Sequence, residues 1–195
     1  HTGKTAKWAA DAVAKWFGPE RKYHFSDDLI PGSQLGAQSE SHLLALLRDD
    51  SIPPIIMATS AYYLGNLPNR NSMDALLKCL ANPNAHVRYQ GLSSLGNFPA
   101  EFWKDAALPL LSDPVRAVRT AAANLLVSLP EDQIPASFRD AYLSARKELE
   151  TYLYFQADFA AGNVLLGDYF LRSKNYGQAQ KFYLRGLDKD REMNY

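Results

Sequence analysis

The chain has 195 residues, and its 21 Lys and Arg residues balance its 21 Asp and Glu residues. The lack of a basic excess argues against a protein that grips nucleic acid through phosphates. No apolar stretch reaches the roughly 18–20 residues that span a bilayer, so we expect no membrane insertion by this segment. The lone Cys79 in ALLKCL excludes an internal disulfide, and its apolar setting favours a buried small hydrophobe over a nucleophile.

The chain opens with HTGKTAKWAADAVAKW, which admits three interpretations. Gly3-Lys4-Thr5 matches the end of a phosphate-binding loop, and His1 matches the end of a Cys-x-x-Cys-His haem box. The third interpretation is that the first five residues are merely the start of a helix. A phosphate-binding loop needs GxxxxGK[ST] after a buried strand, and the surrounding pattern is helical. The spacing predicts a helix over AKWAADAVAKWF, with an apolar side made by Trp8, Ala12, Val13, Trp16 and Phe17.

An internal repeat organises the middle of the chain. The segments AYYLGNLP, LSSLGNFP and NLLVSLP end in Pro68, Pro99 and Pro130, which are 31 residues apart. Further positions obey the same period: Leu64, Leu95 and Leu126; Ile56, Val87 and Val118; and the small residues Ser60, Gly91 and Ala122. A period of this length is typical of stacked helical hairpins.

The third unit shows how each hairpin is built. Residues 101–112 predict a first helix and residues 115–129 a second, which ends at Pro130. Asp113 is the expected N-cap of the second helix, and Pro114 suits its first turn. A lone hairpin cannot bury its apolar face, so the units are expected to stack into a solenoid.

Two loops carry a resemblance to a known family. Asn82-Pro83 with Val87-Arg88, and Asp113-Pro114 with Val118-Arg119, resemble HEAT repeats, specifically short bacterial HEAT-like units over residues 38–130. The first unit departs from the pattern, since Ile56-Met57 replaces Val-Arg. The resemblance implies that Arg88 and Arg119 tie helices and loops together through acidic and backbone acceptors, rather than forming a binding site.

The pattern changes after Pro130. Residues 136–157 predict a longer helix with one apolar stripe of Phe138, Tyr142, Ala145, Leu149 and Leu153. The following segment resembles a tetratricopeptide (TPR) hairpin, with Asn175-Tyr176-Gly177 as the expected turn; the matching residues are Leu166-Gly167, Phe170, Ala179, Tyr183 and Gly186. The predicted organisation is therefore an all-α chain with an N-terminal helix and linker (1–37), HEAT-like repeats (38–130), and a long helix plus TPR-like hairpin (131–195).

The N-terminal helix together with this order of units resembles a group of bacterial multihaem c-type cytochromes. The matching residues are His1, Lys4, Trp8, Ala9-Ala10-Asp11-Ala12-Val13, Trp16 and Gly18-Pro19. That resemblance implies a periplasmic or otherwise extracytoplasmic electron-transfer protein, with haem c in a longer parent protein and His1 as a haem axial ligand there. No Cys-x-x-Cys-His is complete in this sequence, so we expect no cofactor in the segment itself.

The favoured function is a non-catalytic protein–protein interaction scaffold that docks a redox protein. The repeat register places Ala58, Tyr89 and Thr120 in one row on the second helices, and Tyr62, Ser93 and Asn124 in another. The partner-binding candidates are Tyr62, Tyr89, Ser93, Thr120 and Asn124. The alternatives are a HEAT-like lyase of the phycobilin-lyase type or a stand-alone HEAT/TPR adaptor; a DNA-base-excising enzyme fits the neutral charge less well. No catalytic residue and no metal site are predicted.

Overall fold

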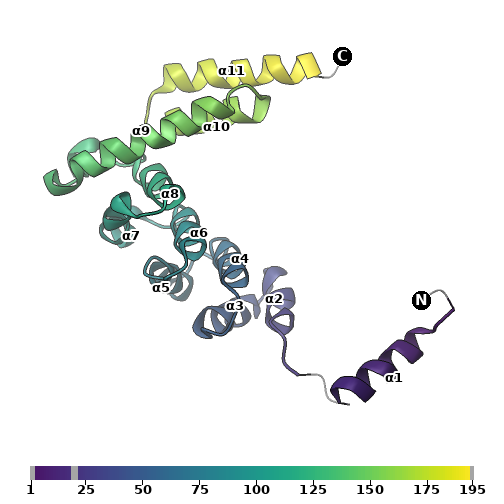
Figure 1. Ribbon diagram of the computed structural model, residues 1–195. Coiled ribbons are helices and arrows are strands. Elements are labelled where there is room, and N and C mark those ends of the chain that lie inside the picture. Colours follow the sequence, from purple (N-terminus) through teal and green to yellow (C-terminus); the bar gives the residue numbers. More distant parts are fainter. Residues whose placement is uncertain (1–2, 19–21, 194–195) are drawn as a thin grey trace.

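The computed structural model describes residues 3–18 and 22–193, and within these ranges the regular structure is entirely helical (Figure 1), which confirms the predicted all-α class. The α-helices are α1 (Ala6–Phe17), α2 (Ser26–Ser33), α3 (Ser39–Arg48), α4 (Pro54–Leu64), α5 (Arg70–Cys79), α6 (Ala85–Leu95), α7 (Ala100–Ala107), α8 (Arg116–Leu126), α9 (Arg139–Gln156), α10 (Ala160–Arg172) and α11 (Tyr176–Met193). Short 3-10 helices are η1 (Leu108–Ser112), η2 (Glu131–Gln133) and η3 (Ala136–Phe138).

The helices form two arms that meet at α8 and α9 (Figure 1). In the first arm, α4, α6 and α8 pack side by side in one row, and each also packs on the helix before it, α3, α5 or α7. In the second arm, α10 packs on α9 and α11 packs on α10. Helix α1 stands apart from both arms in Figure 1, and none of its residues is buried.

The 31-residue period marks the core of the first arm. Leu64, Leu95 and Leu126 are fully buried, and burying a leucine side chain stabilises a fold by about 1.5–3 kcal/mol. The small positions Ser60, Gly91 and Ala122 are buried as well. At Gly91 the helices approach so closely that a Cβ atom would lie 2.9 Å from Cys79 Cβ and 3.2 Å from the carbonyl oxygen of Leu76.

Arg88 joins two successive hairpins. Its Nη1 donates to the carbonyl oxygens of Asn82 and Pro83 (2.8 and 2.9 Å), in the loop that precedes its own helix α6. Its Nε and Nη2 donate to the carboxylate of Asp113 (2.7 and 3.0 Å), in the loop that precedes α8. Both side chains are largely buried, with 12% and 4% of their surfaces exposed. We call this arrangement the arginine clasp.

Arg119 repeats the clasp one unit later. Its Nη1 donates to the carbonyl oxygens of Asp113 and Pro114 (2.9 and 3.2 Å), and its Nη2 reaches both oxygens of Glu148 on α9 (2.8 and 3.0 Å). The second clasp therefore connects the first arm to the second. The prediction that Arg88 and Arg119 tie helices and loops together is confirmed.

The first junction has no clasp. The repeat period places Met57 where the later units have arginine, and Asn82 where the next unit has Asp113. A cavity of about 370 Å³, lined by both residues, lies at this junction. The cation and its acidic partner are thus missing together, and no buried charge is left without a counter-charge.

The second arm is held by one apolar stripe and one polar cluster. Four of the five residues of the predicted stripe, Tyr142, Ala145, Leu149 and Leu153, are buried on α9. The fifth, Phe138, is partly buried and lies in η3 just before α9. Tyr169 of α10 is also fully buried; its hydroxyl accepts a hydrogen bond from Arg146 Nε at 2.8 Å and donates one to Glu150. Both partners belong to α9, so the tyrosine fastens α10 to the long helix.

The hairpin of α10 and α11 closes on a glycine. A Cβ atom at Gly167 would lie 2.4 Å from Tyr183 Cε1, so only glycine allows the two helices this distance of approach. The turn comes earlier than predicted: Lys174 has φ +60°, the Asn175 side chain accepts from Gln178 N–H, and Tyr176 and Gly177 already belong to α11.

Three other expectations need correction. The predicted linker that ends at residue 37 contains α2, which packs on α3 and α4. The predicted helix over 101–112 divides into α7 and η1, because Pro109 has no N–H to continue an α-helix. Asp113 is not the N-cap of α8: Val115 is, and Asp113 Oδ1 instead accepts from Val115 N–H at 2.8 Å while holding Arg88.

Gly91→Ala should destabilise the first arm. The added methyl group meets Cys79 and backbone, and overpacking outweighs the gain in helix propensity, so the free energy of unfolding should fall by about 1–2 kcal/mol. Gly177→Ala is the matched control, because its Cβ meets nothing within 4 Å; it should raise that energy by up to about 1 kcal/mol. Urea denaturation followed by circular dichroism measures both, and equal stabilisation by the two variants would contradict the close packing.

Arg88→Met should cost about 3–5 kcal/mol, because it leaves Asp113 buried without its cation. The double variant Arg88→Met/Asp113→Asn copies the Met57 and Asn82 pair of the first junction and should recover more than half of that loss. A double-mutant cycle by urea denaturation gives the coupling energy. Additive losses would show that the two side chains do not act as a unit.

The clasp should also give an acid-sensitive contribution to stability. Burial works to raise the pKa of Asp113, but hydrogen bonds from Arg88 and Val115 N–H outweigh it and hold the pKa below its ordinary value. The contribution of the Asp113 carboxylate to the free energy of unfolding is therefore complete above its pKa in the unfolded chain, about 4. It is lost as the pH falls through its lower pKa in the folded chain. The stability difference between the native chain and Asp113→Asn should stay constant from about pH 7 to pH 5 and narrow below about pH 4. A difference independent of pH would exclude this titration.

Candidate functional site

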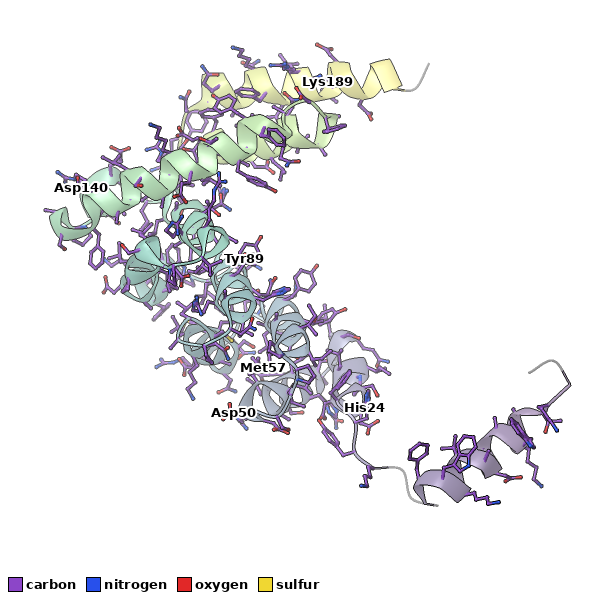
Figure 2. All side chains as sticks on the ribbon, in the orientation of Figure 1. His24, Asp50, Met57, Tyr89, Asp140 and Lys189 are labelled. Carbon is purple, nitrogen blue, oxygen red and sulfur yellow. The ribbon has the colours of Figure 1, made fainter. Side chains whose placement is uncertain are left out.

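A groove lies where the row of α6 and α8 meets α9 and α10. Its volume is about 770 Å³. Tyr89, labelled in Figure 2 near the corner between the two arms, stands at its α6 edge. The residues that line it are Tyr89 and Ser93 of α6; Arg116, Ala117, Thr120, Ala121 and Asn124 of α8; Leu149, Tyr152 and Leu153 of α9; and Leu165, Asp168, Leu171 and Arg172 of α10.

Four of the five residues singled out in the sequence line this groove, namely Tyr89, Ser93, Thr120 and Asn124. Tyr62 is 55% exposed on α4 but lies outside the groove. Ala58, placed by register in the same row as Tyr89, is buried rather than exposed. Helix α2 packs against α4 at this end of the row. His1 lies outside the described residues.

The groove combines a buried apolar floor with a half-exposed apolar rim. Leu149 and Leu153 are almost fully buried beneath it. Tyr152, Leu165 and Leu171 expose 49%, 46% and 47% of their surfaces at its edges. Large apolar side chains in this state still contact water, so a ligand that covers them gains the free energy of removing that surface from water.

One hydrogen-bonded contact joins two walls of the groove. Arg172, in the last turn of α10, donates from Nη1 to the carbonyl oxygen of Asn124 at 2.9 Å and also contacts the Asn124 side chain. Asn124 belongs to α8, so this bridge fixes α10 relative to the first arm. Asn124, one of the predicted partner-binding residues, therefore lines the groove with its backbone and side-chain oxygens already bonded to Arg172.

The charged groups of the groove are Arg116, Asp168 and Arg172. Arg116 makes a single long contact, from Nη2 to the carbonyl oxygen of Glu148 at 3.4 Å, while the Glu148 carboxylate is held by Arg119. Asp168 accepts a hydrogen bond from the Tyr183 hydroxyl at 2.7 Å. Within residues 3–18 and 22–190, neither groove arginine has a carboxylate in ion-pair contact.

Three further properties concern the thiol, metal binding and membrane spanning. Cys79 is buried, and burial raises its thiol pKa to about 11, so it behaves as the inert hydrophobe expected from the sequence. In the described part of the chain, no three His, Cys, Asp or Glu side chains are grouped so that they could hold a metal ion. No described helix combines the length and the apolarity needed to cross a bilayer.

Comparisons with known proteins give no relative from which a function could be transferred: no family model matches the chain, and neither curated proteins nor solved structures yield a match. The functional argument therefore depends on the geometry of the groove.

Proposed function

We propose that the chain is a non-catalytic protein-interaction scaffold, an α-solenoid of HEAT-like hairpins followed by a TPR-like hairpin, which binds a segment of a protein partner in the groove. The observation that carries this proposal is the convergence of Tyr89, Ser93, Thr120 and Asn124 on one cavity of about 770 Å³. Its surface is mainly apolar and is interspersed with polar and charged side chains, a combination that binding sites commonly show.

The groove has the residue types that protein recognition favours. Tyr89 and Tyr152 present broad rings with only two rotatable angles each, so they contribute contact area at little cost in side-chain entropy. Ser93 and Thr120 offer small hydroxyl groups between them. Both helices of the wall are fixed by the arginine clasps, and a prearranged surface loses little conformational entropy when it binds.

The resemblance to multihaem cytochromes supports a more specific form of the proposal. In it, the chain is the docking region of an extracytoplasmic electron-transfer protein that carries haem c in other parts, with His1 as an axial ligand, and its partner is a redox protein. Helix α1 would then connect the haem-bearing part to the scaffold. Its exposed apolar side chains, including Trp16 at 69% and Phe17 at 76%, are available for packing there.

A photo-crosslinking amino acid at Ser93 should capture the partner in cells that make the protein. Ser93 is exposed and lines the groove, whereas Glu101 is exposed on α7 outside it and is the control position. We expect a discrete adduct from position 93 and none from position 101. Mass spectrometry then identifies the partner: a redox protein supports the cytochrome form, and a protein without redox groups supports a stand-alone adaptor. Equal adducts from both positions would contradict the groove as the binding site.

A further inference from the structure

We infer that the groove selects a partner segment in which an aspartate or glutamate side chain lies among large apolar side chains, and that Arg116 binds this carboxylate. The inference rests on the proposed function and deepens it, since it gives the chemistry of the segment. Its basis is a contrast between arginines that are paired with carboxylates and the two that line the groove, which are not.

The arginines of the fold are paired with carboxylates. Arg88 binds Asp113, Arg119 binds Glu148, and Arg146 binds Glu131 and Glu150. The two groove arginines differ, because their hydrogen-bond partners are neutral: a backbone oxygen of Glu148 for Arg116, and the backbone and amide oxygens of Asn124 for Arg172. Their positive charges face the cavity without a carboxylate in contact.

The two groove arginines are not equivalent. Arg116 and Asn124, to which Arg172 is bonded, lie eight residues apart on α8, which is about 12 Å along the helix. Asp168 lies one turn before Arg172 on α10 and lines the same cavity, so it opposes a carboxylate at that end. Arg116 makes no ion pair within the described residues, because the carboxylate of the neighbouring Glu148 is bonded to Arg119, and its long contact leaves most of its donors for a ligand.

The apolar lining determines what must flank the carboxylate. Leu165, Leu171 and Tyr152 are half-exposed at the rim, so side chains of leucine or aromatic size would cover them. Two arginines and one aspartate give the groove a net positive charge, although the whole chain is neutral. A segment that is apolar and basic would match the apolar rim but not the positive charge. A segment that is acidic without apolar residues would match the charge but not the rim.

The test is a selection of binding segments from a displayed library of random 16-residue peptides, with the whole chain as bait. The native chain should enrich peptides that contain Asp or Glu together with Leu, Phe, Tyr or Trp. Arg116→Gln should lose the acidic enrichment and retain the apolar one. Arg70→Gln, a matched loss of charge at a site 77% exposed on α5, should behave like the native chain. Ser93→Trp, which places a bulky ring in the groove, should weaken both enrichments.

The strongest selected peptide and its acid-to-amide analogue then give affinities by titration. Arg116→Gln should weaken the acidic peptide about tenfold, as expected for the loss of one charge-assisted hydrogen bond, and leave the analogue unchanged. Asp168→Asn should strengthen the acidic peptide, and Arg172→Gln should weaken it less than Arg116→Gln does. Thermal melts check that each variant is folded.

Three results would overturn the inference. If the native chain enriches apolar peptides without acids, or if Arg116→Gln retains the acidic enrichment, the carboxylate site is wrong while groove binding stands. If the native chain enriches nothing beyond the Ser93→Trp variant, the proposed function fails and the inference fails with it.

Discussion

The arginine clasp is the interaction on which the rest of the structure depends. A helical hairpin buries only one face, so stability requires that each unit meets the next at a defined angle. Arg88 sets that angle because its planar guanidinium bonds to two carbonyl oxygens of its own loop and to the carboxylate of the next loop. The bonds converge from both units on one rigid group, so the two loops cannot move independently.

The same device creates the groove. Arg119 bonds its own loop in the manner of Arg88, but its carboxylate comes from Glu148, in the middle of the long helix α9. The clasp thus changes partner where the repeat ends, and the chain turns into its second arm there. The corner between α8 and α9, which is the groove, is held by Arg119 on one side and by the bridge from Arg172 to Asn124 on the other.

How far the sequence predicts the structure depends on the range of the signals. The 31-residue period and the stripe on α9 can be read directly from the sequence, and they predict core positions correctly; four of the five partner-binding candidates also line the groove. Helix α2 was missed because Pro31 and Gly32 indicate a loop, whereas the tight contact of Gly32 with Leu43 is tertiary. Arg116 and Arg172 were missed for the same reason: their shared cavity depends on tertiary contacts, such as that between Arg119 and Glu148, which are 29 residues apart.

The clasps are therefore distributed unevenly along the chain, and they lie at the junctions next to the groove. The first junction has Met57 and Asn82, an adjacent cavity of about 370 Å³ and no clasp. The junctions nearer the groove have one clasp each, and beyond them Tyr169 is fastened by Arg146 and Glu150. Removing one partner of a largely buried pair such as Arg88 and Asp113 is costly, so we expect the clasps to hold the units that they join in one arrangement. Their concentration around the groove, and not at the far end of the stack, is what a preformed binding surface requires.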